Sequence, residues 1–190
     1  MKDRFKNFAE LSRHKQEGKD FSITARKAGG IAIVAPHAGS IEEHTAEIAQ
    51  KIAANDHSLY VFKALKGSGG FSDMHITSTQ FDEPKCLDLI SASEMTITIH
   101  GCTGSDAFVY LGGLNEEMKT SLAAEFNKHG IRAMTEGHPF LATSTENICN
   151  KNRQKQGVQL EFSRGLRDNP DLRRKCAKIV RVYLKNYQNN

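Results

Sequence analysis

A short apolar run that breaks at a turn and continues with helical spacing is the most constraining feature of this chain. Residues 31–35 have the length and β-branched content of a strand, and Pro36 and Gly39 then interrupt them. Apolar residues recur at roughly helical spacing over residues 41–52, and Ser40 with a glutamate three residues later is typical of a helix N-cap. The stretch therefore predicts a strand, a tight turn and a helix that begins at Ser40.

Strands and helices are expected to alternate along most of the chain. Apolar runs and alternating patterns predict further strands at residues 21–25, 59–62, 74–78, 96–99, 108–111 and 158–163. Helical spacing and cap residues predict helices at residues 82–90, 115–126 and 169–187. A length of 190 residues without an internal repeat suits one domain. We therefore expect a single three-layer α/β/α domain over residues 1–190, with a mixed, largely parallel sheet.

The charge of the chain indicates an anionic partner. The 26 Lys and Arg residues outnumber the 22 Asp and Glu residues, which gives a net charge of +4 at pH 7. The basic residues do not form a stripe interleaved with aromatic residues, which argues against nucleic acid. The composition therefore favours a polyanionic substrate.

The sequence lacks the features of membrane and secreted proteins. No apolar run approaches the ~20 residues that a transmembrane helix needs. The first ten residues contain no apolar core of signal-peptide length, so we expect a protein that is made in the cytoplasm and stays there unless cells lyse. Cys86, Cys102, Cys149 and Cys176 form no Cys-x-x-Cys pair, and free thiols are expected for them.

Two histidines follow two apolar strands at corresponding points. His37 comes just past the strand that begins at Ile31, and His100 directly follows the apolar run at residues 96–99. Open α/β sheets bind ligands at the carboxyl ends of their strands, so we expect both imidazoles there, together with Glu42. Two imidazoles and one carboxylate form a known catalytic zinc pattern. The sequence therefore predicts a zinc site made of His37, Glu42 and His100.

A glutamate lies inside the last apolar strand. Val158, Leu160 and Phe162 share one face of this strand, and Glu161 lies on the other. A carboxylate in a central strand is costly unless it is paired or functional. This cost favours Glu161 as the general base that takes a proton from the attacking water. The structural alternative is an ion pair with Arg164 or a lysine.

Other roles for these residues remain open from the sequence alone. Glu42 could complement the dipole of the following helix, and His37 could be a polar loop residue. His44 competes with Glu42 as a ligand, although it lies further along the predicted helix. Cys102 lies two residues after His100 and could act as a nucleophile, but catalytic Cys and His partners are usually distant in sequence.

Six motifs keep a common order along nearly the whole chain: Pro36–Glu42, His75–Thr79, Phe81–Pro84, Ile99–Cys102, Asn147–Asn150 and Val158–Arg167. Together they resemble the poly-γ-glutamate hydrolases of phages and prophages of Bacillus-like hosts. Two positions depart from the expected pattern. The spacing from His37 to Glu42 is longer than the His-x-x-Glu of the wider carboxypeptidase superfamily, and Gln80 stands where the family has an arginine.

The resemblance implies a fold similar to zinc carboxypeptidases and zinc-dependent endo-cleavage of γ-linked polyglutamate. It places the metal and the general base on the positions already predicted from the residues themselves. Each residue of such a polymer keeps one free α-carboxylate, so we expect Arg164 and Arg153 to bind these groups. The resemblance further suggests that the enzyme reaches an extracellular capsule after lysis, and we expect a monomer.

Two alternative functions remain. A zinc amidase that acts on a small acylated amino acid would need the same site in a more closed pocket. A non-catalytic polyanion-binding protein would explain the positive charge without zinc, but it does not explain two histidines placed after two apolar strands.

Overall fold

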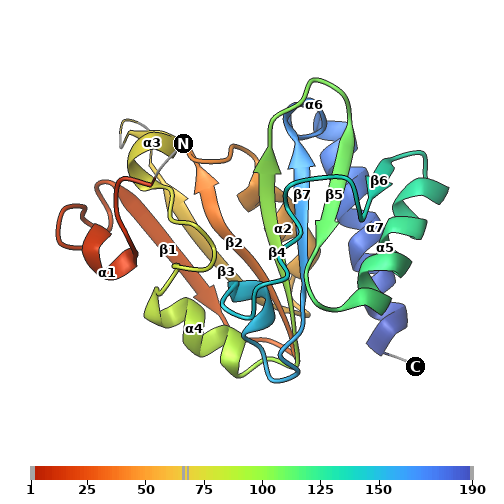
Figure 1. Cartoon of the computed structure of the whole chain (residues 1–190), viewed down its shortest axis with the longest axis horizontal. Helices are drawn as coiled ribbons and strands as arrows, with labels where there is room; N and C mark the ends of the chain where they lie inside the picture. Colours follow the sequence, from red (N-terminus) through yellow and green to blue (C-terminus); the bar gives the residue numbers. More distant parts are fainter. Residues whose placement is uncertain (1–2, 66, 68, 189–190) are drawn as a thin grey trace.

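A seven-stranded mixed sheet forms the centre of the fold (Figure 1). The computed structural model describes residues 3–65, 67 and 69–188, and among them the strand order is β1-β3-β2-β4-β7-β5-β6. The strands are β1 (Phe21–Arg26), β2 (Ile31–Gly39), β3 (Ser58–Ala64), β4 (Met95–Cys102), β5 (Phe108–Gly112), β6 (Arg132–Met134) and β7 (Val158–Ser163). Only the β1–β3 and β5–β7 pairs of this described sheet are antiparallel, which confirms the predicted mixed, largely parallel sheet.

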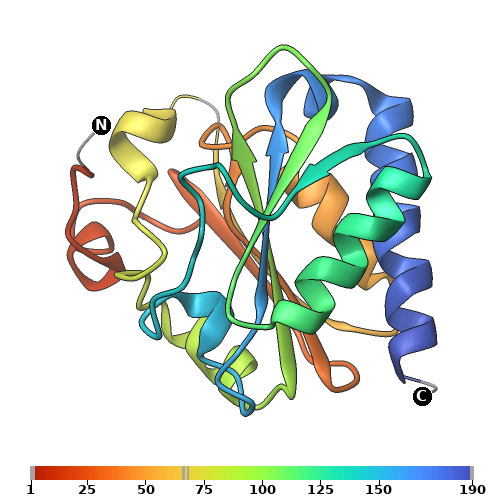
Figure 2. The ribbon, with the colours of Figure 1, turned by 45° about the vertical axis from the view of Figure 1, so that its right-hand side comes forward.

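Helices cover both faces of the sheet (Figures 1 and 2). One face carries α2 (Thr45–Ala53), α5 (Glu116–Lys128) and α7 (Pro170–Gln188). The other carries α1 (Phe8–Leu11), α4 (Pro84–Ser91) and the 3₁₀ turn η1 (Ile148–Asn150). Two short helices, α3 (Gly70–Met74) and α6 (Arg164–Asp168), lie at the edge where β2, β4 and β7 end. Among the helices described, none is long and apolar enough to cross a membrane.

The two faces of β2 contribute to two separate parts of the core. Ile33 and Ala35 pack in the cluster that includes α2, α5 and α7, whereas Ala32 and Val34 pack in the cluster that includes α1 and α4. All four side chains are fully buried because helices cover the sheet on both sides. A polar side chain in such a strand therefore needs a partner or a function.

Side-chain caps determine where two of the helices begin. Asn115 accepts a hydrogen bond from the backbone N–H of Met118 at 2.9 Å, and α5 starts directly after this predicted cap. Glu83 accepts from the N–H of Cys86 at 2.8 Å and caps α4. Pro84 occupies the first position of α4, where its missing N–H has no helical partner to lose.

The helix after β2 begins later than the sequence predicts. α2 starts at Thr45 rather than Ser40, and the residues between them form a turn. Ser40 donates its N–H to the oxygen of Ala64 at 3.1 Å and its hydroxyl to the oxygen of Leu65 at 3.2 Å. These contacts with the end of β3 replace the expected helix cap. Glu42 consequently lies before the helix and not in its first turn.

Two further segments differ from the prediction. Residues 74–78 are not a strand, because α3 ends at Met74 and a loop follows. This loop is held from the N-terminal side, where Asp3 accepts a hydrogen bond from the N–H of Thr77 at 2.7 Å. The sequence does not predict β6, since its three residues are too few to show an alternating pattern.

Candidate active site

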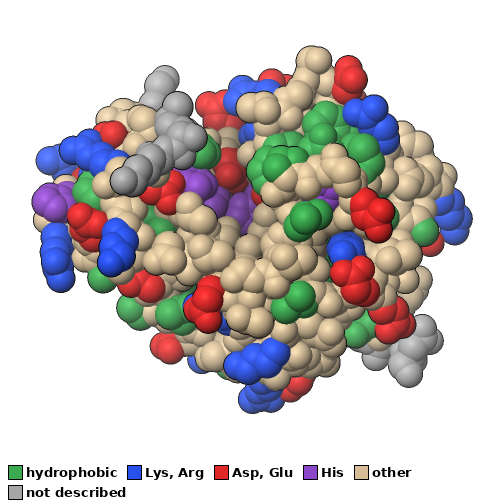
Figure 3. Space-filling model, in the orientation of Figure 1, with side chains coloured by type: hydrophobic (Ala, Val, Ile, Leu, Met, Phe, Trp, Pro, Cys, Tyr) green, Lys and Arg blue, Asp and Glu red, His purple; other side chains and the backbone are tan. Residues whose placement is uncertain are grey.

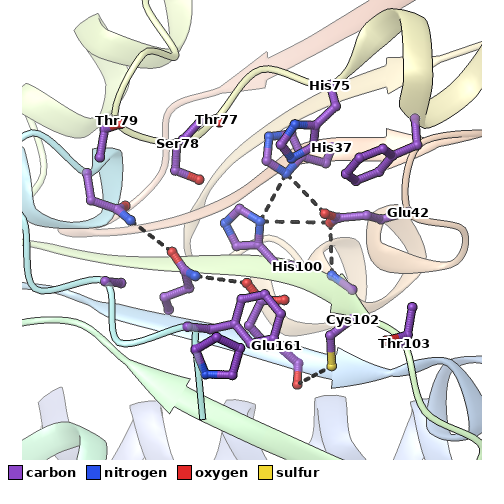
Figure 4. Close-up of a pocket in the computed structure, with 17 residues that line it drawn as sticks. His37, Glu42, His75, Thr77, Ser78, Thr79, His100, Cys102, Thr103 and Glu161 are labelled. Atoms are coloured by element: carbon purple, nitrogen blue, oxygen red, sulfur yellow. Dashed lines mark hydrogen bonds and ion pairs between the residues drawn. The ribbon is translucent and has the colours of Figure 1, made fainter. Parts of the chain in front are cut away.

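A cavity of about 450 Å³ opens at the carboxyl ends of β2, β4 and β7. Figure 3 shows a hollow with histidine side chains in it on this side of the molecule. His37, Glu42, His100 and Glu161 all line the cavity (Figure 4). The structure therefore brings the three predicted metal ligands and the predicted base to one place.

A bulge in β2 directs His37 into the cavity. The register between β2 and β3 shifts between Ala35 and Ala38, so β2 has one extra residue at this point. Pro36 lies inside the bulge, where its missing N–H does not interrupt the ladder. Bulges bend a strand and redirect its side chains, and here the side chain of His37 is only 2% exposed.

The turn after β2 folds Glu42 back onto His37. The N–H of Glu42 donates to the backbone oxygen of His37 at 2.8 Å, and its Oε1 lies 3.2 Å from Nδ1 of His37. The other carboxylate oxygen, Oε2, accepts a hydrogen bond from the N–H of Gly101 at 2.9 Å. The carboxylate is therefore buried and held between the ends of β2 and β4.

Three candidate ligand atoms converge in the cavity. Nδ1 of His37 lies 3.1 Å from Nδ1 of His100, and Nδ1 of His100 lies 3.8 Å from Oε2 of Glu42. Each of the three residues offers one ligand atom, and these atoms all lie within 4.8 Å of one another. This compact group of two nitrogens and one oxygen matches the donor set of a catalytic zinc site with an open position.

The protonation states of the two imidazoles suit metal binding. Nε2 of His37 lies 2.8 Å from the backbone oxygen of Ile76, so this nitrogen carries the proton and Nδ1 presents a lone pair. Burial lowers the pKa of His37 to about 4 and that of His100 well below its usual range, so both rings are neutral near pH 7. His100 has no hydrogen-bond partner for Nε2 among the described residues.

The environment of Glu42 also fits a divalent cation. Burial raises the pKa of Glu42 to about 8, because the ionised carboxylate loses its hydration in this cavity. With its proton on Nε2, His37 presents a lone pair to the ionised carboxylate of Glu42 at 3.2 Å, and neither group can donate to the other. A cation between them would favour the ionised carboxylate and both lone pairs at once.

Glu161 stands beside this group on the neighbouring strand. It pairs with His100 in the register of β4 and β7, and only 4% of it is exposed. Burial and the nearby carboxylate of Glu42 raise its pKa well above the usual range. The alternative ion pair with Arg164 is wrong, since Arg164 contacts Glu43 at 2.7 Å and Asp168 at 2.8 Å.

The two predicted substrate-binding arginines lie in different places. Arg164 lines a second hollow of about 610 Å³, which adjoins the cavity and shares Gly101 and Cys102 with it. Arg153 lies near the opposite end of β4: its N–H donates to the oxygen of Ser93, and its guanidinium pairs with Glu94 at 2.7 Å. Arg153 therefore lies away from the cavity that it was expected to serve as a substrate contact, because its loop folds back to the amino end of β4.

The structure also places Cys102, the candidate nucleophile, and His44, the alternative metal ligand. Burial raises the pKa of the Cys102 thiol to about 12, and its Sγ lies 3.8 Å from the backbone oxygen of Glu161. A protonated thiol is a poor nucleophile, which argues against covalent catalysis by Cys102. His44 lies outside the residues that line the cavity, with Nε2 3.8 Å from Asp168.

The structure adds cavity residues to which the sequence analysis assigns no role. The ring of His75 lies 4.2 Å from that of His37, and its Nδ1 contacts Asp3 at 2.7 Å. Gln159 and Asn147 line the cavity beside Glu161. Gln159 could have been found from strand periodicity, which places it on the same face as Glu161. Asn147 lies in a long polar loop, where no periodicity indicates which side chain turns inward.

Sequence comparisons relate the chain to proteins of Bacillus. The model of a family described as poly-gamma-glutamate hydrolase matches residues 5–182. The SPbeta prophage-derived UPF0714 protein YoqZ of Bacillus subtilis (strain 168) is 35% identical over 163 residues, which cover 85% of this chain and 59% of that protein. The UPF0714 protein YndL of the same strain is 32% identical over 168 residues, covering 87% of this chain and 66% of YndL. The chain thus spans about three fifths to two thirds of the length of these relatives.

Two solved structures are similar over nearly their whole length. A bacteriophage poly-gamma-glutamate hydrolase matches with a TM-score of 0.92 and 27% identity, covering 99% of both chains. The zinc-free apo form of YndL matches with a TM-score of 0.90 and 28% identity, covering 98% of this chain and 99% of that one. The matches therefore extend through every strand that contributes to the cavity.

Proposed function

Because the chain belongs to the poly-gamma-glutamate hydrolase family, we propose that it cleaves γ-glutamyl amide bonds within poly-γ-glutamate. In this proposal His37, Glu42 and His100 hold a zinc ion, and Glu161 is the general base. The observation that supports the proposal most directly is the convergence of the three ligand atoms within 4.8 Å beside a buried carboxylate. A zinc ion bound there supplies a Lewis acid that polarises the scissile carbonyl and makes water more acidic.

Glu161 moves the proton in the proposed reaction. Its carboxylate accepts a proton from the attacking water as the oxygen adds to the γ-carbonyl carbon. The same group then returns the proton to the leaving α-amine as the carbon–nitrogen bond breaks. A buried carboxyl group with a raised pKa is suited to both steps, because it holds a proton more readily than an exposed glutamate.

The shape of the site favours a polymer over a small acylated amino acid. The cavity and the adjoining hollow share Phe71, Gly101 and Cys102 among their lining residues, so they form a continuous depression. An extended chain can occupy both parts, with units on either side of the scissile bond. A small-molecule amidase would need a site closed around its substrate.

Arg164 is the basic residue best placed to bind the polymer. It lies at the second hollow, and about half of its side chain is exposed. Its two partners, Glu43 and Asp168, are also exposed, and such surface pairs contribute only ~0–1 kcal/mol. An α-carboxylate of the substrate can therefore compete for the guanidinium at little cost.

Metal analysis and polymer hydrolysis together test the proposal. Purified protein should contain about one zinc per chain, as a single site of this kind requires. It should shorten poly-γ-glutamate from internal positions, lose this activity with a chelator and regain it with zinc. Full activity in metal-free protein would refute the zinc site. Hydrolysis of small acylated amino acids without polymer cleavage would favour the amidase, and zinc-independent polymer binding without cleavage would favour a binding protein.

A further inference from the structure

We propose that Gln159 and Asn147 are positioning residues that hold the carboxylate of Glu161 through a directed chain of hydrogen bonds. The inference rests on the proposed function, because it assumes that Glu161 is the base. It concerns two residues that neither bind the metal nor carry the proton.

The side chains of Asn147, Gln159 and Glu161 form a continuous line of hydrogen bonds in the wall of the cavity. Nδ2 of Asn147 donates to Oε1 of Gln159 at 3.0 Å, and Nε2 of Gln159 donates to Oε1 of Glu161 at 2.8 Å. All three side chains are buried, with 4–6% of each residue exposed. In such an enclosed place a hydrogen bond to a carboxylate is strong, and water cannot easily replace it.

The backbone N–H of Cys149 sets the direction of this chain of hydrogen bonds. Oδ1 of Asn147 accepts a hydrogen bond from the N–H of Cys149 at 3.1 Å, and a backbone N–H can only donate. Nδ2 of Asn147 must therefore face Gln159, whose oxygen accepts and whose amide nitrogen faces Glu161. Rotation of either amide would place two acceptors or two donors in contact. The arrangement thus presents an N–H group, and never an oxygen, to the carboxylate.

This arrangement determines which carboxylate oxygen is available for chemistry. Gln159 occupies Oε1 of Glu161, and no described residue donates a hydrogen bond to Oε2. A single donor fixes the rotation of the carboxylate while leaving one oxygen for water in the cavity. Productive proton transfer requires the base within hydrogen-bond reach of the water, so a loss of this constraint should lower kcat.

The same residues also have a structural role that must be separated from positioning. Asn147 caps η1 through the N–H of Cys149, so its removal could simply loosen the loop. Asn147→Ser can retain this cap, because serine also accepts from the N–H two residues on, but its side chain is too short to reach Gln159. Gln159→Leu removes the donor to Glu161 with little change in volume.

The test measures kcat, KM, zinc content and melting temperature for these variants on poly-γ-glutamate. Gln159→Leu and Asn147→Ser should each lower kcat by roughly 10–100-fold, with KM and zinc content near the parent values. The double variant should fall no further than Gln159→Leu alone, because both changes break one chain. Asn152→Ser is the matched control: Asn152 is a buried amide of the same loop that contacts the oxygens of Cys149 and Gln156 but does not line the cavity.

Repeating the substitution in a protein that already carries Glu161→Gln distinguishes positioning from damage to the fold. In Glu161→Gln protein, adding Gln159→Leu should leave the residual rate unchanged, since the residue through which it acts has lost its function. An equal further loss in both backgrounds would refute the positioning role, as would a parent-like kcat in Gln159→Leu. An inactive parent protein would instead refute the proposed function, so the two failures are distinguishable.

Discussion

The guanidinium of Arg167 occupies the space where a side chain at Gly101 would lie: a β-carbon added there would meet the central guanidinium carbon at 2.5 Å. Arg167 donates to three backbone oxygens, those of Glu43 at 2.6 Å, Phe162 at 3.0 Å and Cys102 at 3.2 Å. These oxygens belong to the segments that carry Glu42, Glu161 and His100. One buried side chain therefore ties together the three parts of the candidate site.

Gly101→Ala should destabilise the protein and loosen the proposed metal site. The new methyl group forces the guanidinium away from its acceptors, and such overpacking of a buried site typically costs ~1–3 kcal/mol. It should also disturb the N–H of Gly101 that holds Glu42. Denaturant unfolding and zinc affinity measure the two effects. Gly30→Ala is the control, since a β-carbon there meets nothing closer than 3.7 Å. Parent-like stability and zinc affinity in Gly101→Ala would show that the contacts of Arg167 are not needed to hold the three parts of the site together.

Strand geometry explains why the sequence could predict that the candidate ligands and the candidate base lie close together. Parallel strands end at a common edge, so polar residues after two apolar runs are expected to meet there, as His37 and His100 do. The period of two along a strand places Glu161 opposite its apolar neighbours, and the structure places it in the cavity. These inferences need only the alternation of side chains along a strand and the rule that parallel strands end at the same edge of a sheet.

The remaining features depend on contacts that local pattern does not contain. Ser40 and its following glutamate match a helix cap, but contacts with the end of β3 hold Ser40 in a turn. Arg153 follows a long loop whose return to the amino end of β4 no periodicity predicts. The contact of Asn147 with Gln159 and that of Arg167 with Gly101 likewise depend on how loops close over the sheet.

Cys102→Ser should retain most of the activity. The thiol is buried, its pKa is raised to about 12, and it lies beside the backbone oxygen of Glu161. A hydroxyl fits the same space, and the proposed nucleophile is water. Steady-state kinetics with zinc analysis test this expectation. Complete loss of turnover in a folded protein with its zinc would instead support covalent catalysis by the cysteine.

Asp3→Asn should destabilise the protein at neutral pH, and this effect should shrink as the pH falls below the unfolded pKa of an aspartate, ~3.9. Burial alone would raise the pKa of Asp3, but hydrogen bonds from Thr77 and His75 outweigh it and lower the pKa. A carboxylate with a depressed folded-state pKa stabilises the fold above its unfolded pKa of ~3.9, and this contribution is lost as the pH falls through the folded pKa. Unfolding of both proteins across this pH range measures the difference. A difference that stays constant as the pH falls below ~3.9 would contradict this origin of the stability.

Arg164→Gln should raise KM for poly-γ-glutamate by up to roughly fivefold, the scale of an exposed charge interaction. Arg153→Gln is the matched control and should leave KM unchanged, because Arg153 lies at the other end of β4. Molar salt, which shortens the Debye length to ~3 Å, should raise the parent KM and reduce the difference between parent and Arg164→Gln. Equal KM values in all three proteins at low salt would exclude Arg164 as a substrate contact.

Glu161→Gln and Glu42→Gln should separate the base from the metal ligand. Glutamine has nearly the shape of glutamate but cannot accept the proton of water, so Glu161→Gln should lower kcat by at least ~10²-fold. Its zinc content should stay near that of the parent, because the ligand atoms of His37, Glu42 and His100 converge without Glu161. Glu42→Gln should instead weaken zinc binding, since it replaces a charged ligand with a neutral amide.

Zinc titration of both variants, read together with kcat at saturating zinc, decides between the two roles. If Glu161→Gln loses zinc while Glu42→Gln keeps it, the two assignments are reversed. If Glu161→Gln turns over at the parent rate, the proton must go to another group, and the candidate is then His75, which lines the cavity with its ring 4.2 Å from that of His37. His75→Gln measured beside Glu161→Gln would distinguish the two residues, because of these two changes only the one that removes the base should lower kcat by at least ~10²-fold while zinc stays bound.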